Sequence, residues 1–229
     1  MKLQYIQKLT LLDYPGKVAC TVFLYGCNFR CPFCHNPALV TRPPEEGQSL
    51  SELTDLLNKR RGILEGVAVT GGEPLLNDGV FELLYTVRDA GFPVKLDTNG
   101  FFPDRLRRAI EEHLVDYVAV DIKNSPSRYA ETVGLPSVDL SPLLESISLL
   151  EASGIAHEYR TTVIREYHDA RSLTEAASLI RGADRYYLQC FRDTGDLLSG
   201  GCSAYTAEEL AALADAVRSI VPSVALRGV

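Results

Sequence analysis

Apolar runs rich in β-branched residues alternate with helical patterns from near residue 18 to the end of the chain, and this alternation limits the possible folds most. It predicts parallel strands joined by right-handed helical crossovers. The expected strands are Val18–Leu24, Gly66–Thr70, Val94–Thr98, Tyr117–Ile122, Glu158–Ile164 and Tyr186–Cys190. The expected helices are Leu50–Lys59, Val80–Ala90, Asp104–His113, Leu140–Ser153, Ser172–Arg181 and Ala207–Ile220. About six βα units are fewer than the eight of a closed barrel, so we expect an α/β fold, a partial (β/α)6 TIM-like barrel.

The chain is long enough to bury one substantial core. Its 229 residues, 46% of them hydrophobic, fit a single domain over residues 1–229. Residues 1–17 precede the first unit as an N-terminal extension. Within it we expect Tyr5–Leu12 to pair as an antiparallel edge strand and residues 13–16 to form the turn.

The charge and the start of the chain argue against several classes of protein. A formal charge of −7 disfavours a nucleic-acid binder that neutralises many phosphates. Polar residues interrupt the first segment, so we expect no signal peptide, and no apolar stretch is long enough to span a bilayer. We therefore expect a cytoplasmic protein without a membrane partner, whose six cysteines are reduced thiols or metal ligands.

Four unusual motifs lie at the ends of four consecutive expected strands. A cysteine triad follows the first strand, Gly71-Gly72-Glu73-Pro74 follows the second, and Asp97-Thr98-Asn99-Gly100 ends the third, while Asp121-Ile122-Lys123 closes the fourth. The carboxyl ends of parallel strands form one face of a barrel-like sheet, on which βα loops build active sites. The sequence therefore predicts that the four motifs converge on one site.

The cysteine triad consists of Cys27, Cys31 and Cys34, within eight residues of one loop. Three thiolates on a short loop can reach three corners of a [4Fe–4S] cubane. Three ligands leave the fourth iron open, which indicates that a small molecule completes its coordination. The amino and carboxylate groups of S-adenosylmethionine could chelate it there.

The spacing of these cysteines is also compatible with other sites. Cys31-Pro32-Phe33-Cys34-His35 matches the attachment pattern of c-type haem, but that attachment needs export. A structural zinc site would need a fourth ligand, for which His35 or Cys20 is nearest. A thioredoxin-like pair lacks the expected βαβ context and leaves Cys27 unused. The [4Fe–4S] cluster is the favoured interpretation.

The three cysteines outside the triad are expected to be structural. Cys20 falls in an expected core strand, and Cys190 and Cys202 are too few for a second cluster without outside ligands.

The C-x3-C-x2-C pattern, with Phe33 before the last cysteine and the Gly-Gly-Glu-Pro segment after it, resembles the radical S-adenosylmethionine (radical SAM) superfamily over nearly the whole chain. A narrower set of motifs is similar to the activating proteins of glycyl radical enzymes. Its members are residues 13–17, 26–32, 34–37, 96–100 and 160–163. Among these proteins the sequence most resembles the activating proteins of anaerobic ribonucleoside-triphosphate reductase, with pyruvate formate-lyase activating enzyme a more distant relative.

The resemblance implies an activity. An external reductant, flavodoxin or ferredoxin, would reduce the cluster, and S-adenosylmethionine would be cleaved to methionine and a 5′-deoxyadenosyl radical. The radical would remove a hydrogen atom from a glycine of a partner glycyl radical enzyme, here anaerobic ribonucleotide reductase. The same core also occurs in radical enzymes that act on small molecules, such as 7-carboxy-7-deazaguanine synthases, and fold alone does not choose between them.

The resemblance also implies contacts with the cofactors. The residues expected to bind S-adenosylmethionine or lie beside it are Phe33, Gly71, Gly72, Glu73, Pro74, Asp97, Thr98, Asn99, Asp121, Lys123, Arg160 and Gln189. Asp97, Thr98 and Asp121 would line the ribose side of bound S-adenosylmethionine. The corresponding residues of relatives can hold a monovalent cation there.

Three of these assignments have alternatives. Lys123 and Arg160 could instead form salt bridges with acidic loop residues, and Asp97 with Thr98 could cap a helix. His168 could make a proton or cofactor contact near the site, but an isolated histidine on a loop is expected to be an ordinary surface residue.

Overall fold

One eight-stranded sheet organises the computed structural model, which describes residues 1–43, 45–193 and 195–229. The strand order is β10-β9-β8-β7-β6-β5-β3-β2. All neighbours are parallel except β2, which pairs antiparallel with β3 at one edge. The strands are β2 (Tyr5–Thr10), β3 (Ala19–Leu24), β5 (Gly66–Gly71), β6 (Val94–Thr98), β7 (Tyr117–Asp121), β8 (Ala156–Val163), β9 (Tyr186–Cys190) and β10 (Ala225–Arg227).

The predicted strands are confirmed to within two residues at either end, and so is the antiparallel edge strand. With β2 and β10 at its two edges the curved sheet stays open, so the predicted partial barrel is confirmed as well. Two features were not predicted. The three-residue β10 adds a seventh parallel strand, and a separate two-stranded ribbon joins β1 (Lys2–Leu3) to β4 (Gln48–Ser49).

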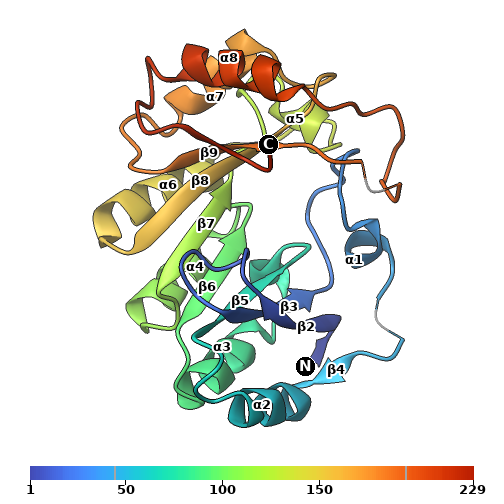
Figure 1. Ribbon diagram of the computed structural model, residues 1–229, viewed down its shortest axis with the longest axis vertical. Coiled ribbons are helices and arrows are strands. Elements are labelled where there is room, and N and C mark those ends of the chain that lie inside the picture. Colours follow the sequence, from blue (N-terminus) through green and yellow to red (C-terminus); the bar gives the residue numbers. More distant parts are fainter. Residues whose placement is uncertain (44, 194) are drawn as a thin grey trace.

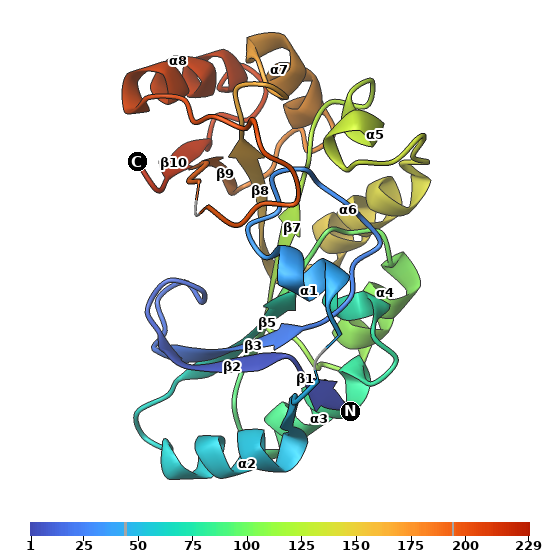
Figure 2. The same ribbon diagram turned by 90° about the vertical axis from the view of Figure 1, so that its right-hand side faces the viewer.

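Helices connect the strands and cover the outside of the sheet (Figures 1 and 2). The predicted six are α2 (Leu50–Lys59), α3 (Val80–Asp89), α4 (Pro103–Glu111), α6 (Ser141–Ser153), α7 (Ala170–Ser178) and α8 (Ala207–Val217). Short elements not predicted are α1 (Pro37–Thr41), α5 (Tyr129–Thr132) and the 3₁₀ turn η1 (Pro74–Leu76). In Figure 1 α1 lies apart from the other helices, beside the ends of the strands.

Local sequence signals set the helix ends. Ser49, Asp169 and Thr206 each cap a helix by accepting a hydrogen bond from the backbone N–H three residues later, and each is part of a reciprocal capping box. Gly154 ends α6 with a φ of 70°, a conformation that glycine adopts without strain.

The middle strands are buried on both faces, as expected for parallel strands covered by helices. Val67–Val69 in β5 and Val118–Val120 in β7 are 0% exposed. The inner face of the sheet is partly charged, because Lys95 of β6 and Glu158 of β8 are also buried there. Among the described residues, no helix has the length and apolar character needed to cross a membrane.

Candidate cofactor site

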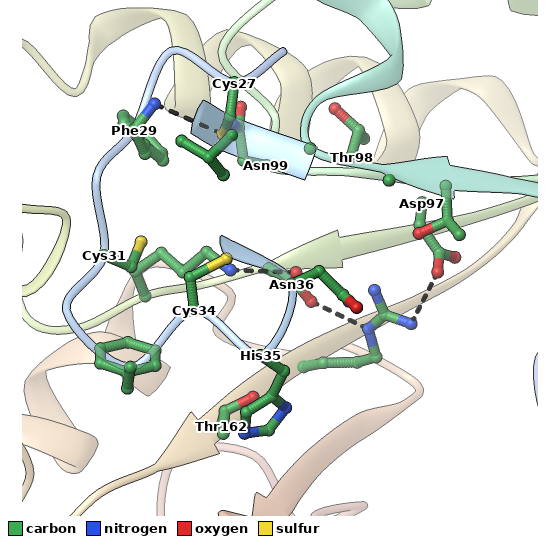
Figure 3. Close-up of a pocket in the computed structure, with 18 residues that line it drawn as sticks. Cys27, Phe29, Cys31, Cys34, His35, Asn36, Asp97, Thr98, Asn99 and Thr162 are labelled. Carbon is green, nitrogen blue, oxygen red and sulfur yellow. Dashed lines mark hydrogen bonds and ion pairs between the residues drawn. The ribbon is translucent and has the colours of Figure 1, made fainter. Parts of the chain in front are cut away.

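A pocket of about 880 Å³, part of it open to solvent, lies at the carboxyl ends of the parallel strands. The four predicted motifs all contribute to it, so the predicted convergence is found. The predicted residues that line it are Cys27, Cys31, Phe33, Cys34, Gly71, Gly72, Asp97, Thr98, Asn99, Asp121, Lys123 and Arg160. In Figure 3 the three cysteines surround one end of the pocket, while Asp97 lies toward the other end.

Some lining residues were missed, and some predicted residues lie elsewhere. Phe29, His35, Asn36, Val40, Thr70 and Thr162 also line the pocket. Thr162 could have been found from its alternation with Arg160 on β8, because residues two apart on a strand share a face. Glu73, Pro74 and Gln189 do not line the pocket.

Remote parts of the chain hold the cysteine loop in place. The N–H of Arg30 donates to the carbonyl of Val133, after α5, over 2.8 Å. The N–H of Ser199 donates to the carbonyl of Pro32 over 2.9 Å. Two segments that are distant in the sequence therefore help to fix the backbone of the cysteine loop.

The Gly71-Gly72 turn packs directly against the start of the cysteine loop. A Cβ on Gly72 would overlap the carbonyl oxygen of Gly26, and a Cβ on Gly71 would overlap the backbone of Leu24. Gly71 also has a φ of 132°. The neighbouring backbone fills the space that their missing side chains leave, so glycine at both positions is what permits this close contact.

Glu73 lies beneath this turn as a fully buried acceptor. Its Oε1 accepts hydrogen bonds from the N–H of Leu75 and the hydroxyl of Thr98, both over 2.9 Å, and its Oε2 accepts one from the N–H of Asn99 over 2.6 Å. Burial raises the pKa of Glu73 to about 7 against the effect of these three donors. Glu73 does not line the pocket, and three of the roughly four acceptor positions of its carboxylate are taken by protein donors.

Charged residues from β6, β7 and β8 form a continuous network on one wall of the pocket (Figure 3). Arg160 bridges Asp97, over 3.3 Å, and Asp121, over 2.9 Å. Lys123 binds the other oxygen of Asp121 over 3.0 Å, and Lys95 binds the other oxygen of Asp97. Salt bridges, the alternative raised for Lys123 and Arg160, are thus present within the site itself.

These contacts decide the charge of both aspartates. Burial disfavours ionised Asp121, but Arg160 and Lys123 outweigh that cost and hold its pKa below its ordinary value. Arg160 and Lys95 do the same for the pKa of Asp97. Lys95 was not predicted as a site residue, although it alternates with Asp97 along β6.

The thiols of Cys27 and Cys31 require a metal before they can ionise readily. Burial raises the pKa of Cys27 to about 11 and that of Cys31 to about 12, and nearby Lys123 opposes both shifts. Iron binding must therefore displace their protons. Among the described residues, no group of three or more His, Cys, Asp or Glu side chains is arranged to hold a single metal ion. Three thiols distributed around a pocket end fit a cubane, whose corners are separate, better than one zinc ion.

Aromatic side chains shield the cysteine end of the pocket. Phe33 packs against Tyr167 with ring centroids 5.6 Å apart, and Phe29 meets the edge of Phe101 at 4.8 Å. Cys202 lies against the cluster around Phe33 and does not line the pocket. These contacts limit access of water to the thiols.

The prediction that His168 is a surface residue is wrong. His168 is 1% exposed, and its Nε2 lies 2.8 Å from the carbonyl oxygen of Lys123. Its Nδ1 lies 3.1 Å from the N–H of Ile164. Burial lowers the pKa of His168, so the neutral ring ties the turn after β8 to the backbone of the Lys123 loop.

Comparison with known proteins agrees with this geometry. A sequence profile of the radical SAM superfamily matches residues 21–175, more than half of the chain. The chain belongs to the radical SAM superfamily. Membership makes it an enzyme and implies a [4Fe–4S] cluster and S-adenosylmethionine as cofactors. The cysteine triad and the aromatic-shielded pocket of this radical SAM enzyme fit such a pair.

Two relatives differ in how much of the chain they match. A Methanocaldococcus jannaschii protein, provisionally named a glycyl-radical enzyme activating enzyme, is 32% identical over 81% of this chain and 78% of its own length. A 7-carboxy-7-deazaguanine synthase of Rhodopirellula baltica is 37% identical, but over only 33% of this chain and 28% of its own.

The fold itself has solved counterparts. SuiB of Streptococcus suis, in its structure bound to S-adenosylmethionine, matches with a TM-score of 0.70 and 14% sequence identity. The match covers 90% of this chain and 49% of SuiB, so this chain spans about half the length of that protein. At this identity the likeness is one of fold.

Proposed function

We propose that this radical SAM enzyme activates a glycyl radical enzyme by removing a hydrogen atom from one of its glycines. The observation that carries the proposal is the similarity to the M. jannaschii relative over about four-fifths of both chains. The similarity to the deazaguanine synthase covers only a third of this chain. A shared core explains a short match, whereas an extended match includes the connections that determine the substrate.

The cofactors supply the difficult chemistry, since an electron from a reduced [4Fe–4S] cluster cleaves S-adenosylmethionine to methionine and a 5′-deoxyadenosyl radical. In this proposal Cys27, Cys31 and Cys34 hold the cluster. Phe33 and Phe29, buried against Tyr167 and Phe101, keep water from that end of the pocket.

The remaining wall would orient the methionine part of S-adenosylmethionine. Lys123 and Arg160 are cations that line the same pocket as the cysteines, and both are fixed by Asp121, over 3.0 Å and 2.9 Å. A carboxylate placed beside them gains charge-assisted hydrogen bonds without reorganising the protein. The backbone of Gly71-Gly72, which lines the same pocket, is available for the amino group.

The partner and the electron donor are proposed from the sequence motifs. Residues 26–32, 34–37 and 96–100 resemble the activating proteins of anaerobic ribonucleotide reductase, which we propose as the partner. Flavodoxin or ferredoxin is the proposed donor, because a low-potential iron–sulfur centre needs a reductant of similarly low potential. Hydrogen-atom transfer then yields 5′-deoxyadenosine and a glycyl radical on the partner.

Anaerobic reconstitution tests the catalytic part of the proposal. Protein carrying about four irons per chain, reduced with dithionite and given S-adenosylmethionine, should release 5′-deoxyadenosine and methionine. A Cys31→Ala variant treated identically should release neither, and a Cys190→Ala variant should behave like the unmodified enzyme. No 5′-deoxyadenosine from protein with a full complement of iron would refute the activity.

Incubation with the candidate partner tests the substrate. Reduced enzyme, S-adenosylmethionine and anaerobic ribonucleotide reductase should give an electron paramagnetic resonance doublet from a glycyl radical. Replacing the partner's radical-bearing glycine by alanine should remove the doublet. An active enzyme that leaves every offered glycyl radical enzyme without a radical would favour a small-molecule substrate instead.

A further inference from the structure

We infer that Lys95 provides, as a fixed side-chain cation, the positive charge that a bound monovalent cation would supply at the Asp97, Thr98 and Asp121 cluster. The inference deepens the proposed cofactor site, whose relatives led us to expect such an ion at these three residues. It follows from what each oxygen of the cluster binds.

Every carboxylate oxygen of the two aspartates already faces a protein cation. One oxygen of Asp97 binds Lys95 and the other lies 3.3 Å from Arg160. One oxygen of Asp121 lies 2.9 Å from Arg160 and the other 3.0 Å from Lys123. A sodium or potassium ion would need several of these oxygens at once, so it would have to displace side chains that the structure fixes.

The third expected ligand is also engaged. The hydroxyl of Thr98 donates its proton to Oε1 of Glu73 over 2.9 Å and accepts a hydrogen bond from the N–H of Gly100 over 3.1 Å. The hydroxyl therefore links the turn after β5 to the turn after β6 by buried hydrogen bonds. Its remaining acceptor capacity is too small to make a hard-cation site alone.

Lys95 is a buried cation paired with Asp97. Its side chain is 2% exposed on the inner face of β6, below the pocket floor, and Asp97 is the acidic group it contacts. A buried ammonium is costly unless it is paired. Pairing with Asp97 satisfies the ammonium and occupies an oxygen that an ion would otherwise bind.

The charge balance of the network supports the same conclusion. Three cations, Lys95, Arg160 and Lys123, face two anions, Asp97 and Asp121, so these five side chains together carry one net positive charge. One incoming carboxylate, such as that of methionine, would neutralise it. A further monovalent ion would raise the charge of a buried cluster to two, which is unfavourable at low dielectric.

The unmodified chain gives the first test and needs no variant. Thermal unfolding of the cluster-free protein should have the same midpoint in potassium, sodium and tetramethylammonium chloride at equal ionic strength. The reconstituted enzyme should form 5′-deoxyadenosine at rates within about twofold in the three salts. A midpoint or rate selectively higher in potassium or sodium would overturn the inference.

A Lys95→Met variant gives the second test, because it frees one oxygen of Asp97 at nearly constant side-chain volume. It should gain a potassium- or sodium-selective rise in unfolding midpoint of about 3–5 °C at 100 mM salt, as expected for a newly formed weak site. A Lys59→Met variant, which removes an exposed lysine at the end of α2, should gain none. A folded Lys95→Met protein that stays insensitive to the cation would show that Lys95 does not fill this role.

The unfolding measurement also separates this inference from the proposed function. It uses protein without cluster, so its result stands even if no 5′-deoxyadenosine is formed. A catalytically inactive chain with the predicted salt response would refute the function and keep the assignment of Lys95.

Discussion

The side-chain amide of Asn99 donates a hydrogen bond to Oδ1 of Asn28 over 2.7 Å, joining the loop after β6 to the cysteine loop. The backbone N–H of Asn99 is itself bound by the buried Glu73. The position of Cys27, next to Asn28, is therefore coupled to the turn after β5 through two hydrogen bonds.

Replacing Asn28 by alanine should loosen the cysteine loop without unfolding the protein. The lost bond is worth about 0.5–1.5 kcal/mol, which corresponds to a roughly 2- to 10-fold faster release of iron. Transfer of iron from reconstituted protein to a chelator measures this rate. An Asn58→Ala variant, which changes an exposed residue of α2, is the control and should release iron at the unmodified rate.

Replacing Glu73 by glutamine should destabilise the chain even without cofactors. An amide has one acceptor oxygen, so a donor among Leu75, Thr98 and Asn99 would face an NH2 group in a buried position. The expected cost is about 1–3 kcal/mol of unfolding free energy, measured by urea denaturation of cluster-free protein. Glu145→Gln, at an exposed ion pair on α6, should cost less than about 0.5 kcal/mol. Equal stability of the two variants would contradict the buried role of Glu73.

How much the sequence could predict differs between the sheet and the site. Strand positions and the shared end of the motifs follow from patterns within the chain, because parallel strands must place their carboxyl ends on one edge. That rule alone predicts that one site includes Cys27, Asp97 and Asp121, and all three line the pocket.

This rule does not predict the direction in which a side chain points. Glu73 and Gly72 are adjacent in the sequence, yet only Gly72 lines the pocket, because the turn buries the glutamate under β6. The burial of His168 depends on the Lys123 backbone 45 residues away. The strand β10 has only three residues, too few for a periodic pattern, and exists because it pairs with β9.

A Gly72→Ala variant should disturb the cysteine loop, since the added methyl would overlap the carbonyl oxygen of Gly26. The added Cβ would lie well inside van der Waals contact distance of that oxygen, so the backbone must shift to relieve the overlap, at a cost of roughly 1–3 kcal/mol. We expect a lower unfolding midpoint and fewer irons per chain after reconstitution. Gly200→Ala is the matched control, because a Cβ there meets nothing within 4 Å. A Gly72→Ala protein with full iron content and unchanged stability would disprove the tight backbone contact.

Alanine at Cys27, Cys31 or Cys34 should abolish cluster binding, because each thiolate serves one iron of the cubane. Visible absorption and iron analysis after anaerobic reconstitution measure the loss. Alanine at Cys190, which does not line the pocket, should leave the iron content unchanged. Normal iron content in any triad variant would overturn the ligand assignment.

The pair of Glu158 and Arg227 should make stability depend on pH in the acid range. Glu158 is 0% exposed, and Arg227 donates two hydrogen bonds to it over 2.8 Å and 3.1 Å, while the hydroxyl of Tyr117 donates a third over 2.9 Å. Burial alone would raise the pKa of Glu158, but the bonds from Arg227 outweigh it and hold the pKa below the ordinary 4.5. Glu158 therefore binds protons less readily in the folded than in the unfolded chain. Its contribution to the unfolding free energy is complete above the ordinary pKa of 4.5. That contribution is lost as the pH falls through the lower pKa of the folded state.

An Arg227→Met variant should reveal this contribution. Glu158 would keep only Tyr117 as a donor, so its folded-state pKa would rise and the acid-side loss of stability would begin at a higher pH. At neutral pH the variant should lose about 1–3 kcal/mol, less than for a fully buried pair because the Arg227 side chain is 35% exposed. Urea denaturation of cluster-free protein between pH 3.5 and 7.5 (roughly spanning the ordinary carboxyl range) measures both effects. Parallel stability curves for the variant and the unmodified chain would show that the ion pair does not control this titration.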